Sequence, residues 1–329
     1  MLTLPAFEWV RPDSLDEALR WLADDPAQQL VVAGGTDAVP NLKHRLHTPR
    51  RIVHLSGLRE MQGIVSDADG LTIGALVTLS ALADDPDAMH DAALVADAAS
   101  RVASPQIRNM GTVGGNLCLD TRCTYYNQTF FWREALGFCL KKDGTRCHVV
   151  TQGKRCVAAH SSDVAPALIA LGATVEIASA EGRRRVAVDE FFVGDGIHNN
   201  VLVPGELVVS VHVPAAARRL SASYRKLRPR GAIDFPMLSV AFAARSESGA
   251  CAEARLVVSA LGAKPRVVGG TDALVRGKPL DAAAADALAE AAYKQCRPLT
   301  NVPYDADWRH EMVRVFVRRA VRDVIEGSA

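Results

Sequence analysis

The cysteines are the residues of this sequence whose types and spacing point most directly to chemistry. Five of the seven cysteines in the 329-residue chain fall within residues 118–160. Four of them follow the spacing Cys123-x15-Cys139-x7-Cys147-x8-Cys156. Four thiolates are the ligand set of a [4Fe-4S] or [2Fe-2S] cluster, and equally of an all-thiolate zinc site. Because the closely spaced pairs of ribbon-type zinc sites and bacterial ferredoxins are missing from the sequence, the spacing leaves both metals open.

The remaining cysteines and two nearby histidines are predicted to play no part in chemistry. Cys118 adjoins a glycine-rich loop and is expected to be a small buried residue, although it is a fifth candidate ligand. Cys251 and Cys296 are isolated and are predicted to lie in the core, where free cysteine is common. His148 and His160 could replace a thiolate, but we expect each to be an ordinary polar side chain.

A double-glycine turn offers a second kind of chemistry. Gly34-Gly35-Thr36-Asp37 directly follows Leu30–Ala33, which is predicted to be a short buried strand. Unhindered backbone N–H groups in such a turn can bind an anion, and Thr36 adds a hydroxyl group. An ordinary turn, with Asp37 as a solvated helix cap, is the alternative. The glycine spacing of a Rossmann loop is absent.

Residues 106–117 contain a second glycine-rich stretch, which we expect to be a loop close to a ligand. Arg108, Asn109, Thr112 and Asn116 lie around Gly114-Gly115 and could all bond a phosphate or a ring edge. A polar turn that satisfies its own backbone is the alternative. Two such loops in one chain favour a large cofactor that carries phosphate.

The cysteine-rich segment, residues 118–160, differs in composition from the rest of the chain. It carries seven Lys and Arg against three Asp and Glu, and it holds six of the 18 aromatic residues. We therefore expect it to pack rather than to be a flexible loop. Its positive charge would offset a negative cluster or dock an acidic electron carrier. A flavin beside a one-electron cluster gains a redox partner, which zinc cannot be, so iron–sulfur is favoured.

The elements that must position these residues show mixed helix and strand periodicity. Ser14 and Glu17 form a capping box for a helix over 14–25, whose apolar stripe is Leu15, Leu19 and Leu22. Further strands are predicted at 51–55, 71–75, 173–177, 206–213 and within 221–262, further helices at 79–103, from 163, at 281–297 and at 305–325, and a linker at 215–220.

Composition excludes several classes of protein. The net charge of +1, without a long basic block, argues against a nucleic-acid surface. The longest uncharged apolar stretch, Val164–Val175, contains Pro166 and is too short to span a bilayer. The first residues lack the pattern of a signal peptide. We therefore expect a soluble, cytoplasmic chain without a disulfide framework.

Four motifs occurring in order give the chain a family resemblance. They are Ala33-Gly-Gly-Thr-Asp37, Ile73–Thr78, Ile107–Asn116 and Ser162–Leu168. Together they resemble the FAD-binding subunit or domain of the xanthine oxidase (molybdenum hydroxylase) family. The resemblance implies an α+β fold, in which a two-subdomain FAD-binding region is followed by a C-terminal domain of sheet and helices. The implied domains are residues 1–56, 57–216 and 217–329.

The resemblance also implies which residues contact FAD. Residues 32–37 would wrap the pyrophosphate, Asp163 would bond the adenosine half, and Lys226 would lie near the isoalloxazine unless it is an ordinary strand-surface lysine. The implied FAD-binding residues are Val32, Ala33, Gly34, Gly35, Thr36, Asp37, Thr78, Thr112, Gly115, Asn116, Asp163 and Lys226.

Residues 118–160 depart from the family pattern, which has a short connection here. A four-cysteine loop at this place resembles the 4-hydroxybenzoyl-CoA reductase branch of the family, whose flavin subunit carries an additional [4Fe-4S] cluster. The implied ligands are Cys123, Cys139, Cys147 and Cys156.

The branch resemblance also implies partners. They are a molybdopterin-binding large subunit that dehydroxylates the substrate, a small subunit with two [2Fe-2S] clusters and a ferredoxin-like electron donor, with no nucleic acid and no membrane. No catalytic residue is expected in this chain. The alternatives are a flavin subunit whose cysteine loop is a zinc-stapled docking module, and a stand-alone flavin oxidoreductase, against which the lack of an acid/base cluster counts.

Overall fold

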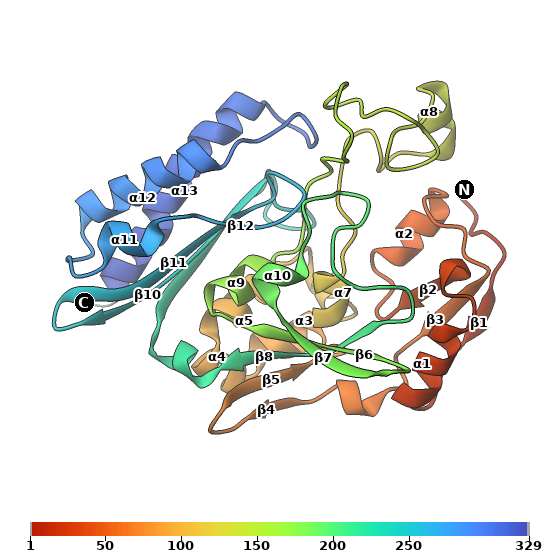
Figure 1. Cartoon of the computed structure of the whole chain (residues 1–329), viewed down its shortest axis with the longest axis horizontal. Coiled ribbons are helices and arrows are strands. Elements are labelled where there is room, and N and C mark those ends of the chain that lie inside the picture. Colours follow the sequence, from red (N-terminus) through yellow and green to blue (C-terminus); the bar gives the residue numbers. More distant parts are fainter. Residues whose placement is uncertain (1, 328–329) are drawn as a thin grey trace.

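The computed structural model describes residues 2–327 and contains three β-sheets (Figure 1). Residues 1, 328 and 329, at the outer ends of the first and last predicted domains, lie outside the described part. Each sheet lies within one of the three predicted domain ranges, while the boundaries between those ranges remain predictions. The mixed helix and sheet architecture agrees with the expected α+β class.

The first sheet is small and parallel. Its strands are β1 (Glu8–Val10), β3 (Arg51–His54) and β2 (Gln29–Val32), in that order. Since β2 is an edge strand, it is not the buried strand that we predicted: Val32 is buried, but Val31 is exposed. Helix α1 (Leu15–Ala23) begins at Ser14 as predicted, and its apolar stripe is buried. The Glu17 carboxylate accepts from the backbone of Asp13 rather than Ser14.

The second sheet is antiparallel, and helices cover it. Residues 79–103, predicted as one helix, form three: Pro86 lacks an N–H group and starts a new helix behind the Asp85 cap, and a second break falls at Ala92. The strand order is β4 (Ile64–Ser66), β5 (Gly70–Gly74), β8 (Leu207–Pro214), β6 (Thr174–Ser179) and β7 (Gly182–Ala187), and the helices are α3 (Leu79–Asp84), α4 (Pro86–Asp91), α5 (Ala93–Ser100), α9 (Val164–Ala170) and α10 (Val188–Phe191).

The third sheet has helices on one face and the rest of the molecule on the other. Along its strand β10 (Leu238–Glu247), Val240 and Phe242 face the core under the C-terminal helices, whereas Ala241 and Ala243 face the core shared with α1, α5 and α9. Such alternation follows from the two-residue period of a strand. The other strands are β9 (Ser221–Leu227), β11 (Ala250–Ser259) and β12 (Arg266–Val267), and the helices are α11 (Thr271–Val275), α12 (Ala282–Gln295) and α13 (Ala306–Gly327).

Two further expectations concern the C-terminal region. Cys251 and Cys296 are buried in the core under the helices, as predicted. The predicted linker at 215–220 is a short 3-10 helix, in which Arg218 donates to the Asp91 carboxylate at 2.6 Å. Among the helices of residues 2–327, none has the length and apolar character needed to cross a bilayer.

Residues 118–160, which we call the insert, extend away from the three sheets and carry the short helix α8 (Phe130–Ala135) (Figure 1). The insert leaves and re-enters the fold at one place, where Arg122 and Ala159 exchange two backbone hydrogen bonds of 2.8 and 2.7 Å. We call these two hydrogen-bonded segments, around Arg122 and Ala159, the neck. The insert is thus an excursion from one place in the fold, and the aromatic packing that we expected is only partial: Tyr126 is buried, whereas Phe130, Phe131 and Trp132 are exposed.

Candidate functional site

A cavity of about 570 Å³ lies between the first sheet, the second sheet and the neck. This glycine-loop cavity has the volume of a typical cofactor or ligand site. Its walls include both glycine-rich stretches that the sequence singled out. The C-terminal domain contributes Ile233 and Phe235 from the loop between β9 and β10.

The two glycine loops lie back to back, at a distance that only glycine permits. A Cβ atom on Gly34 would be 1.7 Å from the carbonyl oxygen of Met110, and one on Gly114 would be 2.7 Å from the Cβ of Ala75. Gly35 adopts φ +72°, a left-handed conformation that favours glycine. These glycines therefore serve to bring backbones together, in addition to leaving N–H groups unhindered.

The second stretch is more regular than the loop that we predicted over 106–117. It contains α6 (Pro105–Arg108) and α7 (Val113–Leu117), separated by a turn. The Thr112 hydroxyl caps α7 by accepting from the N–H of Gly115 at 3.1 Å. The Asn116 side-chain oxygen accepts from the Ser162 hydroxyl at 2.6 Å. Asn116 therefore ties this polar stretch to the start of α9, because the same oxygen also accepts from the N–H of Val164.

The structure brings most of the predicted FAD-binding residues to one cavity, and three of the twelve lie elsewhere. Thr78 caps α3 by accepting from the N–H of Ala81. Asp163 and Lys226 form a buried ion pair of 2.8 Å with each other, and Tyr224 also donates to the Asp163 carboxylate. Burial raises the pKa of Asp163 above its ordinary value. Those lining the cavity are Val32, Ala33, Gly34, Gly35, Thr36, Asp37, Thr112, Gly115 and Asn116.

Asp37 is only partly exposed and does not use its side chain as a helix cap. It precedes α2 (Ala38–Lys43) but makes no capping hydrogen bond with its side chain. Instead its carboxylate pairs with the Arg122 guanidinium, which also lies over the ring of Phe235 at 4.2 Å from the centroid. Sequence reasoning missed Arg122 and Phe235, because no local signal links positions so far apart in the chain.

Cys118 was predicted to be buried, and this prediction is wrong. Its side chain is exposed and lines the glycine-loop cavity. Cys118 directly follows α7, which carries Asn116, so both residues line the same cavity. Cys118 does not line the cavity around which the other insert cysteines gather.

The four predicted metal ligands come together in the insert. Cys123, Cys139, Cys147 and Cys156 line one small cavity, which we call the cysteine cavity. Burial, with a smaller contribution from the other three sulfurs, raises the pKa of the Cys123 thiol to about 11. All seven cysteines of the chain are free. Within residues 2–327, no three His, Cys, Asp or Glu side chains are grouped closely enough to hold a metal ion.

Backbone N–H groups are directed at two of these sulfurs. Val150 donates to the Sγ of Cys147 at 3.4 Å, and Ala158 donates to the Sγ of Cys156 at 3.5 Å. Hydrogen bonds of this kind favour thiolate and tune the potential of sulfur-ligated metal centres. A Cβ atom on Gly196 would lie 2.7 Å from the Cys156 sulfur, so the loop after α10 also closes on the cavity.

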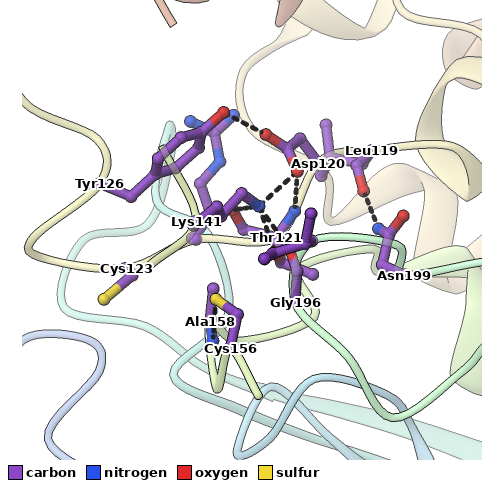
Figure 2. Close-up of polar contacts among 12 residues, drawn as sticks. Leu119, Asp120, Thr121, Cys123, Tyr126, Lys141, Cys156, Ala158, Gly196 and Asn199 are labelled. Carbon is purple, nitrogen blue, oxygen red and sulfur yellow. Dashed lines mark hydrogen bonds and ion pairs between the residues drawn. The ribbon is translucent and has the colours of Figure 1, made fainter. Parts of the chain in front are cut away.

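A buried lysine forms part of the wall of the cysteine cavity (Figure 2). The Lys141 ammonium donates to the Asp120 carboxylate at 2.6 Å and to the Gly196 carbonyl at 2.7 Å. The hydroxyl of Tyr126 donates to the other Asp120 oxygen at 2.8 Å. Charge-assisted hydrogen bonds between buried groups are strong, so they fix the position of this part of the insert.

Two more polar side chains attach the insert to the rest of the fold. The fully buried Arg133 donates to the carbonyls of His44 and Arg45, which follow α2. From the C-terminal domain, Asn301 donates to the Val157 carbonyl at 2.6 Å, and its own carbonyl accepts from the N–H of Thr124. Asn301 therefore contacts both cysteine-bearing segments just beyond the neck, at Thr124 and at Val157.

The two histidines that could replace a thiolate, His148 and His160, lie in different surroundings. His148 lines the cysteine cavity, where its ring stacks on Tyr125 with centroids 5.1 Å apart and its Nε2 contacts the Phe138 carbonyl. His160 is fully buried against Phe192, and neither ring nitrogen has a hydrogen-bond partner among the described residues. Burial lowers the pKa of His160 to about 3, so it is a neutral core residue.

Neighbouring residues line the glycine-loop cavity and the cysteine cavity, and we call the residues between the two cavities the wall. Arg122 lines the first and its neighbour Cys123 lines the second. Adjacent Cα atoms are about 3.8 Å apart, so the neck brings the two cavities close together. The same wall contains Asp120, which lines the first cavity, and Lys141, which lines the second.

Two known protein families match most of this chain. Residues 5–216 match the family described as FAD binding domain in molybdopterin dehydrogenase, and residues 222–324 match the CO dehydrogenase flavoprotein C-terminal domain. The aldehyde oxidoreductase FAD-binding subunit of Escherichia coli K12 is 34% identical over 247 residues, covering 72% of this chain and 77% of that protein. The carbon monoxide dehydrogenase medium chain of Hydrogenophaga pseudoflava is 27% identical, covering 96% of each chain.

Solved structures agree with these matches. A structure of the carbon monoxide dehydrogenase of Hydrogenophaga pseudoflava superimposes with a TM-score of 0.82 at 25% identity, covering 98% of this chain and 99% of the other. Quinoline 2-oxidoreductase from Pseudomonas putida 86 superimposes with a TM-score of 0.80 at 25% identity, covering 99% of each.

Proposed function

Because the chain belongs to the xanthine oxidase family of FAD-binding medium subunits, we propose that it transfers electrons between two cofactors, FAD and a [4Fe-4S] cluster. The glycine-loop cavity would hold FAD, and the cysteine cavity would hold the cluster. FAD exchanges electrons singly or in pairs and the cluster exchanges them singly, which is the chemistry these cofactors would supply. The observation that carries the proposal is the shared wall between the two cavities.

The residues of the glycine-loop cavity fit a cofactor with a pyrophosphate. Gly34 and Gly35 leave the backbone N–H groups of their turn unhindered, and Thr36 adds a hydroxyl donor. Arg122 neutralises Asp37 beside this turn, so the carboxylate does not repel an anion. Thr112 and Asn116 are already ordered by their own hydrogen bonds. The chain's task here is to bind and orient FAD.

The residues of the cysteine cavity support an iron–sulfur cluster, whose four cysteine ligands bind separate iron atoms and so need not be grouped as closely as the ligands of a single metal ion. Four thiols line one cavity, two of them accept backbone N–H bonds, and the Lys141 ammonium lies in the wall. Bound iron would keep all four as thiolates, whereas burial alone raises the pKa of the Cys123 and Cys156 thiols. A flavin cavity at the same wall favours a redox centre over structural zinc, because zinc takes no part in electron transfer.

The partner subunits are part of the same proposal. Medium subunits of this family work beside other chains, and we propose a molybdopterin-binding large subunit, a small subunit with [2Fe-2S] clusters and a ferredoxin-like donor. The four-cysteine insert favours reductive dehydroxylation of 4-hydroxybenzoyl-CoA on the large subunit. The 34% identity to an aldehyde oxidoreductase subunit favours a second candidate, oxidation of an aldehyde by the partner subunit.

Cofactor content tests the electron-transfer proposal. The purified complex should contain about four iron and four sulfide per copy of this chain beyond those of the small subunit, one FAD, and an additional EPR signal after reduction. Cys139→Ser should remove that iron and signal while FAD remains. Cys296→Ala, a core cysteine outside both cavities, should retain everything. Zinc in place of iron at this site would overturn the cluster proposal and support the zinc-stapled alternative.

Substrate assays separate the two partner reactions. The complex is incubated with 4-hydroxybenzoyl-CoA and a reduced low-potential dye, and separately with aromatic and aliphatic aldehydes and an oxidised dye. Formation of benzoyl-CoA supports the reductase. Aldehyde-dependent dye reduction, with no benzoyl-CoA formed, supports the oxidoreductase. If this chain alone turned over either substrate, the subunit proposal would fail.

A further inference from the structure

The wall between the two cavities contains an ion pair with a definite direction (Figure 2). Lys141 Nζ lies 2.6 Å from Asp120 Oδ1, and the two side chains are 5% and 21% exposed. Lys141 is one of the residues that line the cysteine cavity, and Asp120 is one of those that line the glycine-loop cavity. An ion pair in this position is a fixed dipole across the wall.

Several contacts prevent this dipole from turning. Lys141 also donates to the Thr121 hydroxyl and to the Gly196 carbonyl, and its ammonium lies 4.4 Å from the centroid of the Tyr126 ring. Tyr126 in turn donates to Asp120. Because both charges are held by the protein and Lys141 is buried, the direction of their field is fixed, and water screens it less than it screens the field of exposed charges.

We propose that the Asp120–Lys141 ion pair sets the difference in reduction potential between the two cavities, so that Lys141 is a positioning residue for electron transfer. A cation beside the cysteine cavity stabilises an added electron there, and an anion beside the glycine-loop cavity disfavours one. The pair therefore raises the potential of the cysteine-cavity centre and lowers that of the flavin. The first half of the inference rests on the proposed cluster, whereas the second requires only bound FAD.

Other charges near the wall are less suited to this role. Lys142 is 31% exposed and pairs with Asp143, so water and its partner screen it. His47 lies 3.9 Å from Asp120 at the glycine-loop cavity, but burial lowers its pKa. Arg122 pairs with Asp37. Lys142 therefore provides a matched control, since it is the next residue and carries the same charge.

The first experiment is a redox titration of the holoenzyme followed by EPR and visible absorbance. In Lys141→Gln, the ratio of reduced to oxidised cysteine-cavity centre at a fixed potential should fall about tenfold, which is about 59 mV for a one-electron couple. Lys142→Gln should change that ratio less than about twofold. An unchanged ratio in Lys141→Gln with full iron content, or equal shifts in both variants, would overturn the proposal.

The second experiment keeps the inference testable if Lys141→Gln fails to assemble its centre. Asp120→Asn should make both centres easier to reduce, and the flavin should change more than the cysteine-cavity centre. A purely structural role would leave both ratios unchanged. Lys141→Arg should retain the wild-type ratio, and a tenfold fall in that variant would contradict an electrostatic role.

The two proposals can fail separately. Wild-type complex without iron or sulfide at this site would refute the cluster but leave the flavin measurement in Asp120→Asn intact. Iron and sulfide present, with no response to either substitution, would refute the dipole and leave the cluster in place.

Discussion

The two cavities on either side of the neck are constructed in different ways. The glycine-loop cavity depends on backbones in direct contact, because Gly34 and Gly114 let neighbouring segments approach where any side chain would clash. The cysteine cavity depends on long polar side chains, Arg133, Lys141 and Asn301, which reach backbone carbonyls of distant segments. One site is positioned by close packing and the other by a few strong hydrogen bonds.

This difference determines how each site should respond to damage. Close-packed backbone cannot relax, so an added methyl group should disrupt the first cavity as a whole. A site held by separate polar contacts should weaken in steps as each is removed, leaving the sheets intact. The following variants test that contrast.

The largest effect is expected from Gly34→Ala. Its methyl carbon would fall 1.7 Å from the Met110 carbonyl oxygen, so the two loops must separate. We expect the loss of most FAD and a decrease of more than about 3 kcal/mol in the free energy of unfolding. FAD absorbance per chain and urea denaturation measure both. Gly63→Ala, where nothing lies within 4 Å of the added carbon, is the control. Full FAD content in Gly34→Ala would show that the loops separate freely.

Arg133→Met should produce the next largest effect, and in the insert alone. The variant loses two charge-assisted hydrogen bonds to the segment after α2, which we expect to cost about 2.5 kcal/mol. Faster amide exchange in α8, less iron and unchanged FAD are the expected results. Arg155→Met, at an exposed position of the same insert, should change none of these quantities. If FAD were lost as readily as iron, the two cavities would not be independent in the way described.

Asn301→Ala should have a smaller effect, confined to the cysteine-bearing segments around residues 124 and 157. The lost hydrogen bond to the Val157 carbonyl should cost about 1.5 kcal/mol, while the backbone bond from Thr124 to residue 301 remains. Amide exchange followed by mass spectrometry should show faster exchange near residues 124 and 157. If the amide protons of these segments exchanged as slowly as in the wild type, the neck alone would be enough to order them.

The smallest effect is expected from Asp91→Asn, which lies outside both cavities. The Arg218 guanidinium and the Ser66 hydroxyl hold the pKa of the buried Asp91 well below its usual value. A lowered folded-state pKa contributes stability above the unfolded pKa of about 3.9, and this stability is lost as the pH falls further. The variant should therefore be about 1 kcal/mol less stable at pH 7 and closer to the wild type at pH 3. Urea denaturation at both pH values measures this, and a pH-independent difference would contradict it.

Much of the fold could be predicted from the sequence, because the decisive signals were local. The cap at Ser14, the alternation through residues 206–213 and the amphipathic pattern of the last helix each lie within a few residues of one another. The glycine motifs likewise located the glycine-loop cavity. Where prediction was wrong, sheet position or a proline decided the outcome, as for the edge strand β2 and the break at Pro86.

The contacts that organise the cysteine cavity could not be predicted in the same way. Asn301 meets Val157 across 144 positions of the chain, and Arg133 meets His44 across 89. Neither residue type nor spacing carries information about such pairings. Lys141 looked like one more member of a basic segment, yet it is buried against Asp120. Cys118 was predicted to be buried because it adjoins the glycine-rich loop, but its side chain is exposed and lines the glycine-loop cavity.

The neck bears on how the insert was gained in evolution and on how it can be transferred by protein engineering. Since Arg122 and Ala159 pair directly, the two ends of the insert lie side by side, so a change in the length of the segment between them need not separate them. The entropy of closing such a loop rises only slowly with its length, so a long excursion costs the parent fold little more than a short one. If the cysteine cavity holds the proposed cluster, one inserted segment would give a flavoprotein a second redox site, and grafting residues 118–160 onto a family member without such an insert would repeat that change in the laboratory.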